Sequence, residues 1–388
     1  MVVEHVQQAG DETAGRRTTI IDGAAIVLIV AVAAASVWRA RHGMPDDVYI
    51  FLRYSRRLAD GDGWAFNPGG DGANGATSPL WVLLLAASSK VHADLVANAV
   101  AMYGVGLAGA GAITYRSLRR LDMPLVGLGA GLLLVANPVL LDVVGMETGL
   151  MLLLVAVVVH QAVLRRPGVA AGVAGGLLIL ARPDGALLIA AVLAMVVWRT
   201  RRVPWRMAVG GLVTLVPWCI YSILQFGTPV AGTLSAKSAQ GRSGFFGPSF
   251  VFLRYGRTIV QHPWSLTLLL LSLIGVVLAF WTRRSRDFAV VLVIYGAAHL
   301  ALYGIVIRPP AYLWYYAPEY YLMSIFSLVA VHQIAVIVLP RALPSARPLG
   351  ALVAVTVVAC VLVGLELREP APTDRYGGYR VAASWLAD

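Results

Sequence analysis

The chain of 388 residues is 59% hydrophobic and 13% charged, and its mean hydropathy is +0.75. Soluble proteins carry about 25% charged residues, so these values exclude a soluble fold and predict an all-α integral membrane protein. The net charge of +11 comes mainly from arginines in short clusters between apolar stretches. This is the charge pattern of membrane topology, and it disfavours a nucleic-acid partner.

The apolar stretches predict about eleven membrane-spanning helices, with the N-terminus in the cytoplasm and the C-terminus outside, when the arginine clusters are placed inside. The predicted passes are residues 20–38, 95–115, 124–141, 147–164, 168–181, 184–198, 207–225, 264–282, 288–306, 318–339 and 349–366. Residues 79–91 are too short to cross and predict a half-length helix. The remaining parts are a cytoplasmic tail (1–19), outer loops (39–78 and 226–263) and a final segment (367–388) after a membrane module of residues 20–366.

Residues 168–198 are interrupted by Arg182, Pro183, Asp184 and Gly185. Each half is only about 21 Å long at 1.5 Å per residue, which is short for a bilayer. Irregular backbone and charge at membrane depth require protein or water around them, so a water-filled groove that opens to the outer face is predicted. Arg182 and Asp184 either pair with each other or line this groove, where Arg182 is a candidate for binding phosphate.

The first outer loop carries the strongest candidates for chemistry. Pro45, Asp46 and Asp47 form a favourable helix start. The residues that follow predict an amphipathic helix at the membrane surface, with Asp46, Arg53 and Arg57 near one face. A carboxylate can take a proton from a hydroxyl, and arginine can bind a phosphate. The alternative is an acid pair that only caps its helix.

Four further candidates have plain structural alternatives. Glu147 begins a predicted helix, where it can simply stabilise the helix dipole. Lys237 is one of two lysines in the chain and lies in the second outer loop, although an exposed lysine is usually only solvated. Tyr315 and Tyr316 lie at the outer ends of two passes, where aromatic residues commonly form an interfacial belt. The functional alternative for both tyrosines is a wall that stacks on a sugar.

Other kinds of site are disfavoured by the sequence. His160, His299 and His332 lie in apolar stretches without metal-binding spacing, so they are predicted to be buried, hydrogen-bonded histidines of the bundle. Neither a Gly-x-Ser-x-Gly elbow, a phosphate-binding Gly-Lys-Ser/Thr loop nor a dinucleotide fingerprint stands out. Nucleotide-sugar use and ATP-driven transport are therefore disfavoured.

Several motifs follow one another along the chain. They are residues 46–55 (DDVYIFLRYS), 58–69 (LADGDGWAFNPG), 76–81 (ATSPLW), 145–150 (GMETGL), 181–185 (ARPDG), 226–229 (FGTP), 233–237 (TLSAK) and 315–318 (YYAP). The set resembles C-type (GT-C) polyprenyl-phosphate-sugar-dependent glycosyltransferases, and most narrowly the actinobacterial terminal arabinofuranosyltransferases of cell-wall arabinan. One motif alone is weak, but the ordered series is specific.

The resemblance implies an inverting transfer of a sugar in which Asp46 or Asp47 is the catalytic base. We favour Asp46, with Asp47 as its orienting partner or as a ligand of a divalent cation, and we expect Asp46→Asn to abolish transfer with little loss of folding. No cofactor is otherwise implied, and a metal at this pair stays open. The implied donor-phosphate or substrate residues are Arg53, Arg57, Glu147, Arg182, Lys237, Tyr315 and Tyr316.

The implied activity is transfer of arabinofuranose from a polyprenyl-phosphate donor to a cell-wall glycan or glycolipid acceptor, at the outer face of the plasma membrane. Relatives continue into an extracytoplasmic domain of which residues 367–388 resemble only the start. Three alternatives remain open. They are a mannosyl- or other hexosyltransferase acting on glycolipid or protein, a flippase for a lipid-linked sugar, and a non-catalytic partner of a full-length enzyme.

Overall fold

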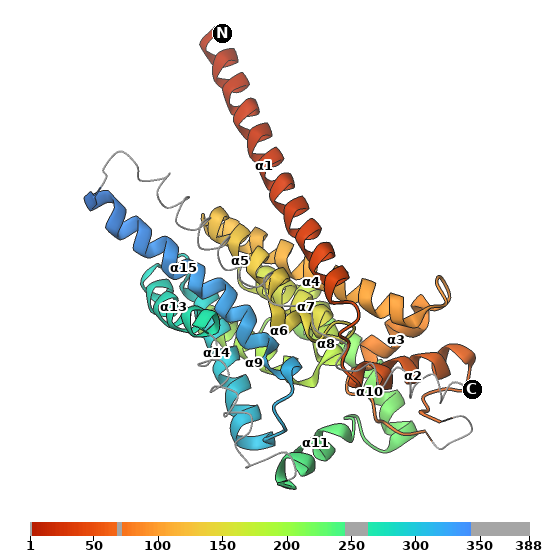
Figure 1. The fold of residues 1–388 in the computed structure, drawn as a ribbon. Helices are drawn as coiled ribbons and strands as arrows, with labels where there is room; N and C mark the ends of the chain where they lie inside the picture. The colour runs from red at the N-terminus through yellow and green to blue at the C-terminus, as the bar shows by residue number, and fades with distance from the viewer. Residues whose placement is uncertain (1, 68–71, 245–262, 343–388) are drawn as a thin grey trace.

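The computed structural model describes residues 2–67, 72–244 and 263–342, and all regular secondary structure within them is helical (Figure 1). The helices are α1 (Val2–Ala40), α2 (Asp47–Asp60), α3 (Pro79–Ser88), α4 (Leu95–Arg120), α5 (Pro124–Ala136), α6 (Pro138–Leu141), α7 (Thr148–Ala162), α8 (Val169–Ala181), η1 (Pro183–Gly185), α9 (Ala186–Thr200), α10 (Trp205–Phe226), α11 (Thr233–Arg242), α13 (Pro263–Trp281), α14 (Arg286–Ala301), the π-helical turn η2 (Leu302–Ile307), η3 (Leu313–Tyr316) and α15 (Ala317–Ala342). The predicted all-α class is confirmed.

Six segments within the described residues are long and apolar enough to cross a membrane. They are Thr19–Ala40, Leu95–Arg120, Pro183–Thr200, Trp205–Phe226, Arg286–Ile307 and Leu313–Val336. Five shorter apolar helices accompany them, which supports a protein that passes through the membrane several times. The predicted pass 349–366 and the final segment 367–388 lie outside the described residues, so the count of eleven stays a prediction.

Two predicted boundaries differ from the structure. The helix α1 begins at Val2, although only its part from Thr19 onward has the composition of a span. The predicted pass 124–141 is divided into α5 and α6 at Asn137 and Pro138, so its prediction as one continuous helix is wrong. Asn137 has extended backbone angles, as expected before a proline, and its side chain caps α6 by accepting the N–H groups of Val139 and Leu140.

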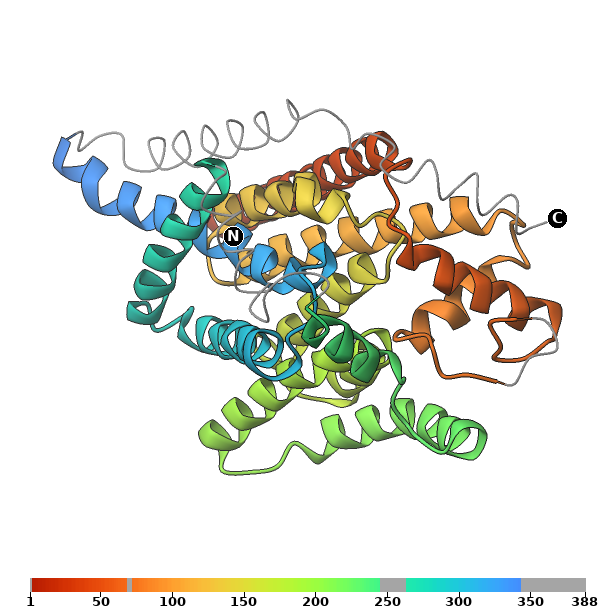
Figure 2. The ribbon, with the colours of Figure 1, turned by 60° about the horizontal axis from the view of Figure 1, so that its bottom comes forward.

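Close helix packing positions the start of α7, where Glu147 lies. A Cβ atom on Gly106 of α4 would lie 2.6 Å from the backbone of Gly149, and one on Gly149 would lie 2.6 Å from the backbone oxygen of Tyr103. Only glycine allows two helix backbones to approach this closely. The helix α4 also packs against α1 and α5, so it forms the centre of the first half of the bundle (Figures 1 and 2).

The predicted interruption between residues 181 and 186 is confirmed. Arg182 has extended backbone angles (φ −152°, ψ 124°), because the ring of Pro183 disfavours the helical conformation in the residue before it. From this point the chain diverges, since α8 packs mainly on α10 and α9 packs mainly on α14. Arg182 and Asp184 therefore lie where the chain passes from the α8–α10 pair to the α9–α14 pair.

The first loop forms the predicted amphipathic helix α2, which ends at Asp60 and is capped by Gly61 with φ +92°, in the left-handed region that favours glycine. Its apolar face, including Val48, Phe51 and Leu52, is buried, and the helix packs on α3. The rest of the loop packs against α10, where the ring centres of Trp64 and Trp218 lie 4.7 Å apart. Figure 1 shows α2 and α11 at the same end of the bundle, which we call the loop face.

Candidate functional site

A cavity of about 340 Å³ lies at the loop face, where segments distant in the sequence meet. Its walls come from α2, the start of α7, the interruption at η1, α11, η2 and η3. Of the residues predicted to act in catalysis or binding, the cavity is lined by Asp47, Glu147, Arg182, Lys237 and Tyr315. The structure therefore brings together five candidates that the sequence places far apart.

Asp47 and Lys237 form an ion pair at the cavity wall, with 3.3 Å between the Asp47 Oδ2 and Lys237 Nζ atoms. About one fifth of each side chain is exposed. Lys237 Nζ also lies 4.2 Å from the centre of the Tyr312 ring and 5.7 Å from that of Trp314, so aromatic faces stabilise its charge. Burial raises the pKa of Asp47, an effect that Lys237 opposes and the Asp46 charge reinforces.

Asp46 has a different position. It is exposed, it does not line the cavity, and its Oδ1 atom accepts the backbone N–H of Asp47 at 3.0 Å. This is the capping role that the sequence offered as the alternative for the acid pair. The preference for Asp46 as the catalytic base is not tested by this placement, but Asp47 is the carboxylate that faces the cavity.

The pair does not fit a divalent cation. One carboxylate caps the helix and the other contacts an ammonium group, whereas such a cation is bound by several oxygen ligands that converge on it. Among the residues that the structure describes, no group of three or more His, Cys, Asp or Glu side chains could hold a metal ion.

Three predicted binding residues lie outside the cavity lining. Arg53 donates from Nε to the Phe66 carbonyl at 3.0 Å and lies over the Phe66 ring. Arg57 pairs with Asp62 at 3.0 Å. Both arginines therefore contact the first loop itself. Tyr316 is buried and is likewise absent from the cavity wall.

Arg182 lies in a buried charge network that lines the cavity. It donates from Nη1 to Glu147 Oε1 at 3.0 Å and from Nη2 to Asp184 Oδ2 at 2.9 Å. Its guanidinium carbon also lies 5.4 Å from the centre of the Tyr315 ring. The sequence offered two alternatives for Arg182, pairing with Asp184 or lining a groove, and in the structure Arg182 does both. Two carboxylates, Glu147 and Asp184, therefore contact the Arg182 guanidinium. Lys237, another cation that lines the cavity, pairs with one carboxylate, that of Asp47.

The network extends into α14 and α15 through residues that the sequence did not single out as functional. Tyr303 donates its hydroxyl to Asp184 Oδ2 at 2.7 Å. His299 lies 3.4 Å from Asp184 through Nε2, and its Nδ1 lies 2.8 Å from Glu319 Oε1. The prediction of buried, hydrogen-bonded histidines is therefore confirmed for His299 and, through Ser117, for His160. It is wrong for His332, which is half-buried and whose Nδ1 has no hydrogen-bond partner among the described residues. The sequence could have pointed to this network through Glu319, an acid inside an apolar stretch. A charge at membrane depth is costly, so such an acid predicts a nearby polar partner.

Glu147, which lines the cavity, also carries a buried acceptor without a partner in the described part of the chain. Its side chain is 2% exposed, and Oε1 is bound to Arg182. Among the described residues, its Oε2 atom has no hydrogen-bond partner. A buried acceptor without a partner costs about 1–3 kcal/mol.

Comparison with known proteins places the fold. No family model matches the chain. No curated protein matches its sequence either.

Solved structures do match. ArnT from Cupriavidus metallidurans bound to undecaprenyl phosphate has a TM-score of 0.61 at 16% identity, over 90% of this chain and 77% of that one. The apo form of ArnT has a TM-score of 0.57 at 18% identity, with 90% and 76% covered.

The oligosaccharyltransferase of Archaeoglobus fulgidus, in complex with Zn and sulfate, has a TM-score of 0.59 at 14% identity. The match covers 93% of this chain but only 55% of the archaeal one. ArnT and this oligosaccharyltransferase are GT-C glycosyltransferases. At such low identities the likeness concerns the fold alone, and the chain therefore has a GT-C-like membrane fold.

Proposed function

We propose that this protein is a glycosyltransferase that moves a sugar from a polyprenyl-phosphate donor to a hydroxyl of an acceptor at the loop face. The observation that carries the proposal is the paired Asp47 and Lys237 at the wall of a cavity of about 340 Å³. A base and a cation are the two groups that such a transfer needs most. The GT-C-like fold supports the same reaction class, since one neighbour was solved with undecaprenyl phosphate.

In the proposed reaction the acceptor oxygen attacks the anomeric carbon while the bond from that carbon to the phosphate oxygen breaks. Asp47 takes the hydroxyl proton, and the polyprenyl phosphate leaves with the electron pair of the broken bond. Lys237 stabilises the charge that develops on the phosphate. The donor phosphate would replace Asp47 as the partner of Lys237, which frees the carboxylate to act as a base.

The finer assignment follows from the sequence motifs. We propose arabinofuranose as the sugar and a cell-wall glycan or glycolipid as the acceptor, with the loop face outside the cytoplasm at the plasma membrane. Membranes that contain the protein should be incubated with radiolabelled polyprenyl-phosphate arabinose and, separately, mannose. A new glycosidic product from arabinose is expected. A product from mannose alone would make the protein a hexosyltransferase. Movement of either donor across vesicles without product would indicate a flippase and overturn the proposal.

The pH dependence of transfer should report the charges around Asp47. A base acts when ionised, so activity is expected to rise with pH through the raised pKa of Asp47. Asp46→Asn removes a like charge and should move this acid limb of the kcat/KM profile to lower pH. Lys237→Gln removes the opposing charge and should move it to higher pH. Asp62→Asn, which alters an exposed carboxylate paired with Arg57, is the control, and an unmoved limb in both test variants would exclude Asp47 as the base.

Lys237→Gln should also weaken binding of the polyprenyl-phosphate donor by about 10–100-fold, because a hydrogen bond to a charged group contributes about 1.5–3 kcal/mol. Lys237→Arg keeps the charge and should recover part of the affinity. Donor binding to the purified protein measures both. Arg242→Gln, an exposed position on the same helix α11, should bind the donor as the parent does. Equal losses in Lys237→Gln and Arg242→Gln would indicate a general effect of surface charge.

A further inference from the structure

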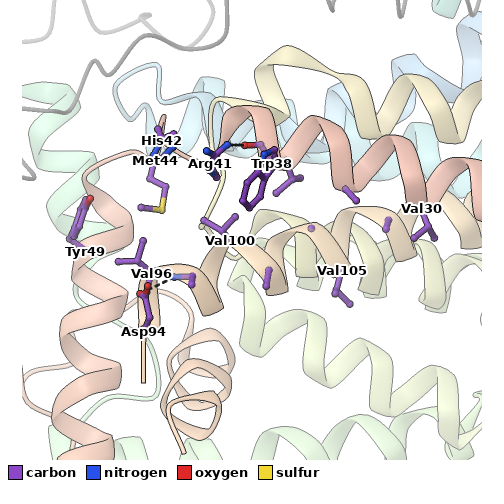
Figure 3. Close-up of a pocket in the computed structure, with 16 residues that line it drawn as sticks. Val30, Trp38, Arg41, His42, Met44, Tyr49, Asp94, Val96, Val100 and Val105 are labelled. Carbon is purple, nitrogen blue, oxygen red and sulfur yellow. Dashed lines mark hydrogen bonds between the residues drawn. The ribbon is translucent and has the colours of Figure 1, made fainter. Parts of the chain in front are cut away.

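A second and larger cavity lies between α1 and α4, where it forms a groove of about 740 Å³ (Figure 3). It shares no lining residue with the cavity at Asp47. The first turn of α2 separates the two, since Tyr49 lines the groove while Asp47 and Ile50 line the other cavity. The groove is thus not part of the site described above.

The walls of the groove are apolar, and both helices that form them include segments long and apolar enough to cross a membrane. Small residues on α4, including Ala97, Ala101 and Gly104, form one side. The other side is the apolar part of α1, which is long and hydrophobic enough to cross the membrane. Val105 on the rim is 70% exposed, so the groove opens sideways. Apolar walls that face the bilayer are solvated by hydrocarbon chains, and a narrow groove orders such a chain along its length.

One end of the groove is polar. Figure 3 shows Arg41, His42 and Asp94 at this end and Val30 at the other. The Asp94 carboxylate accepts the backbone N–H groups of Val96 and Ala97 and so caps α4. The Arg41 guanidinium lies 3.9 Å from the centre of the Trp38 ring.

The charge of Arg41 is available to a ligand. Arg41 directly follows α1 and donates to the Trp38 carbonyl in the last turn of that helix. In the part of the chain that the structure describes, no ion pair involves Arg41. An arginine at the membrane surface with an aromatic neighbour matches the level of lipid headgroups. Its guanidinium fork suits a phosphate.

We propose that this groove is a binding site for an anionic glycerophospholipid, with one acyl chain between α1 and α4 and the phosphate at Arg41. The length of the groove supports an acyl chain. From Val30 to Arg41 the helical rise amounts to about 17 Å, close to the ~15 Å of one leaflet of a ~30 Å hydrocarbon core. A polyprenyl chain is far longer than one leaflet. If a polyprenyl phosphate bound in this groove, the first turn of α2 would also separate its phosphate from Lys237.

The test uses the full chain in nanodiscs that contain a phosphatidylglycerol with a photoreactive group on its acyl chain. Labelling is expected in peptides from residues 30–44 and 94–108, read out by mass spectrometry. Ala101→Phe fills the groove and should abolish this labelling. Arg41→Gln leaves the groove open and should reduce labelling by phosphatidylglycerol about tenfold, because a charge-assisted hydrogen bond to the lipid phosphate is lost. Ala297→Phe, at an exposed alanine of α14, is the matched control and should be labelled as the parent is.

Three results would overturn the proposal. Labelling that survives in Ala101→Phe would mean that the lipid lies elsewhere. Displacement of the label by polyprenyl phosphate at concentrations where unlabelled phosphatidylglycerol has no effect would assign the groove to the donor. Cysteine cross-links from Ala101→Cys to residues 343–388 or to a second copy would show that protein covers it. None of these readouts depends on transferase activity, so the proposal can fail while the proposed function holds.

Discussion

Replacing Asp47 with Asn should lower transfer by at least about 100-fold, the lower end of what general base catalysis contributes. The substitution keeps the size of the side chain and removes the proton acceptor at the cavity wall. Folding should be little affected, because the change removes a carboxylate whose ionised form is disfavoured by burial. The rate with saturating donor and the thermal unfolding midpoint measure the two effects separately.

Asp46→Asn is the matched control for this variant. Asp46 is exposed and caps α2 through the backbone N–H of Asp47, and asparagine is an equally good cap. At a pH well above the acid limb we expect its activity to stay within about tenfold of the parent, since no proton acceptor is lost from the cavity. If instead Asp46→Asn is inactive and Asp47→Asn is active, the sequence-based preference for Asp46 is right and our assignment is wrong.

Arg182→Met should destabilise the protein by about 3–5 kcal/mol, the usual cost of removing one partner from a buried ion pair. Arg182, Glu147 and Asp184 side chains are 7%, 2% and 2% exposed. Without the guanidinium, two carboxylates would remain buried with one cation fewer. The thermal unfolding midpoint in a fixed detergent should fall well below that of the parent.

Two comparisons make this prediction specific. Arg57→Met breaks the exposed pair with Asp62 and should cost no more than about 1 kcal/mol. Combining Arg182→Met with Glu147→Gln and Asp184→Asn removes the stranded charges and should recover much of the loss. An unfolding midpoint for Arg182→Met that equals that of Arg57→Met would mean that the buried network contributes little to stability.

Local patterns predict much of this fold. The length of apolar stretches predicts the helices of the bundle, because satisfying backbone hydrogen bonds in lipid leaves a helix as the simplest structure. The start of α2 follows from Pro45 and the two acids after it, and the interruption at Arg182 follows from Pro183. Asn137 and Pro138 also indicate the division of the 124–141 pass, because they are a cap and a first-turn residue of a new helix. Hydrophobicity alone does not show this division, since the residues on both sides are apolar.

The site depended on tertiary structure. No pattern within the first loop distinguishes Asp46 from Asp47, since which carboxylate faces a cavity depends on how α2 is rotated against its neighbours. The contact of Asp47 with Lys237 and that of Arg182 with Glu147 join segments far apart in the chain. Such contacts depend on the packing of several helices at once, including the glycine contact of α4 with α7. Sequence periodicity reports the face of each helix separately, and only the assembled bundle determines which faces meet.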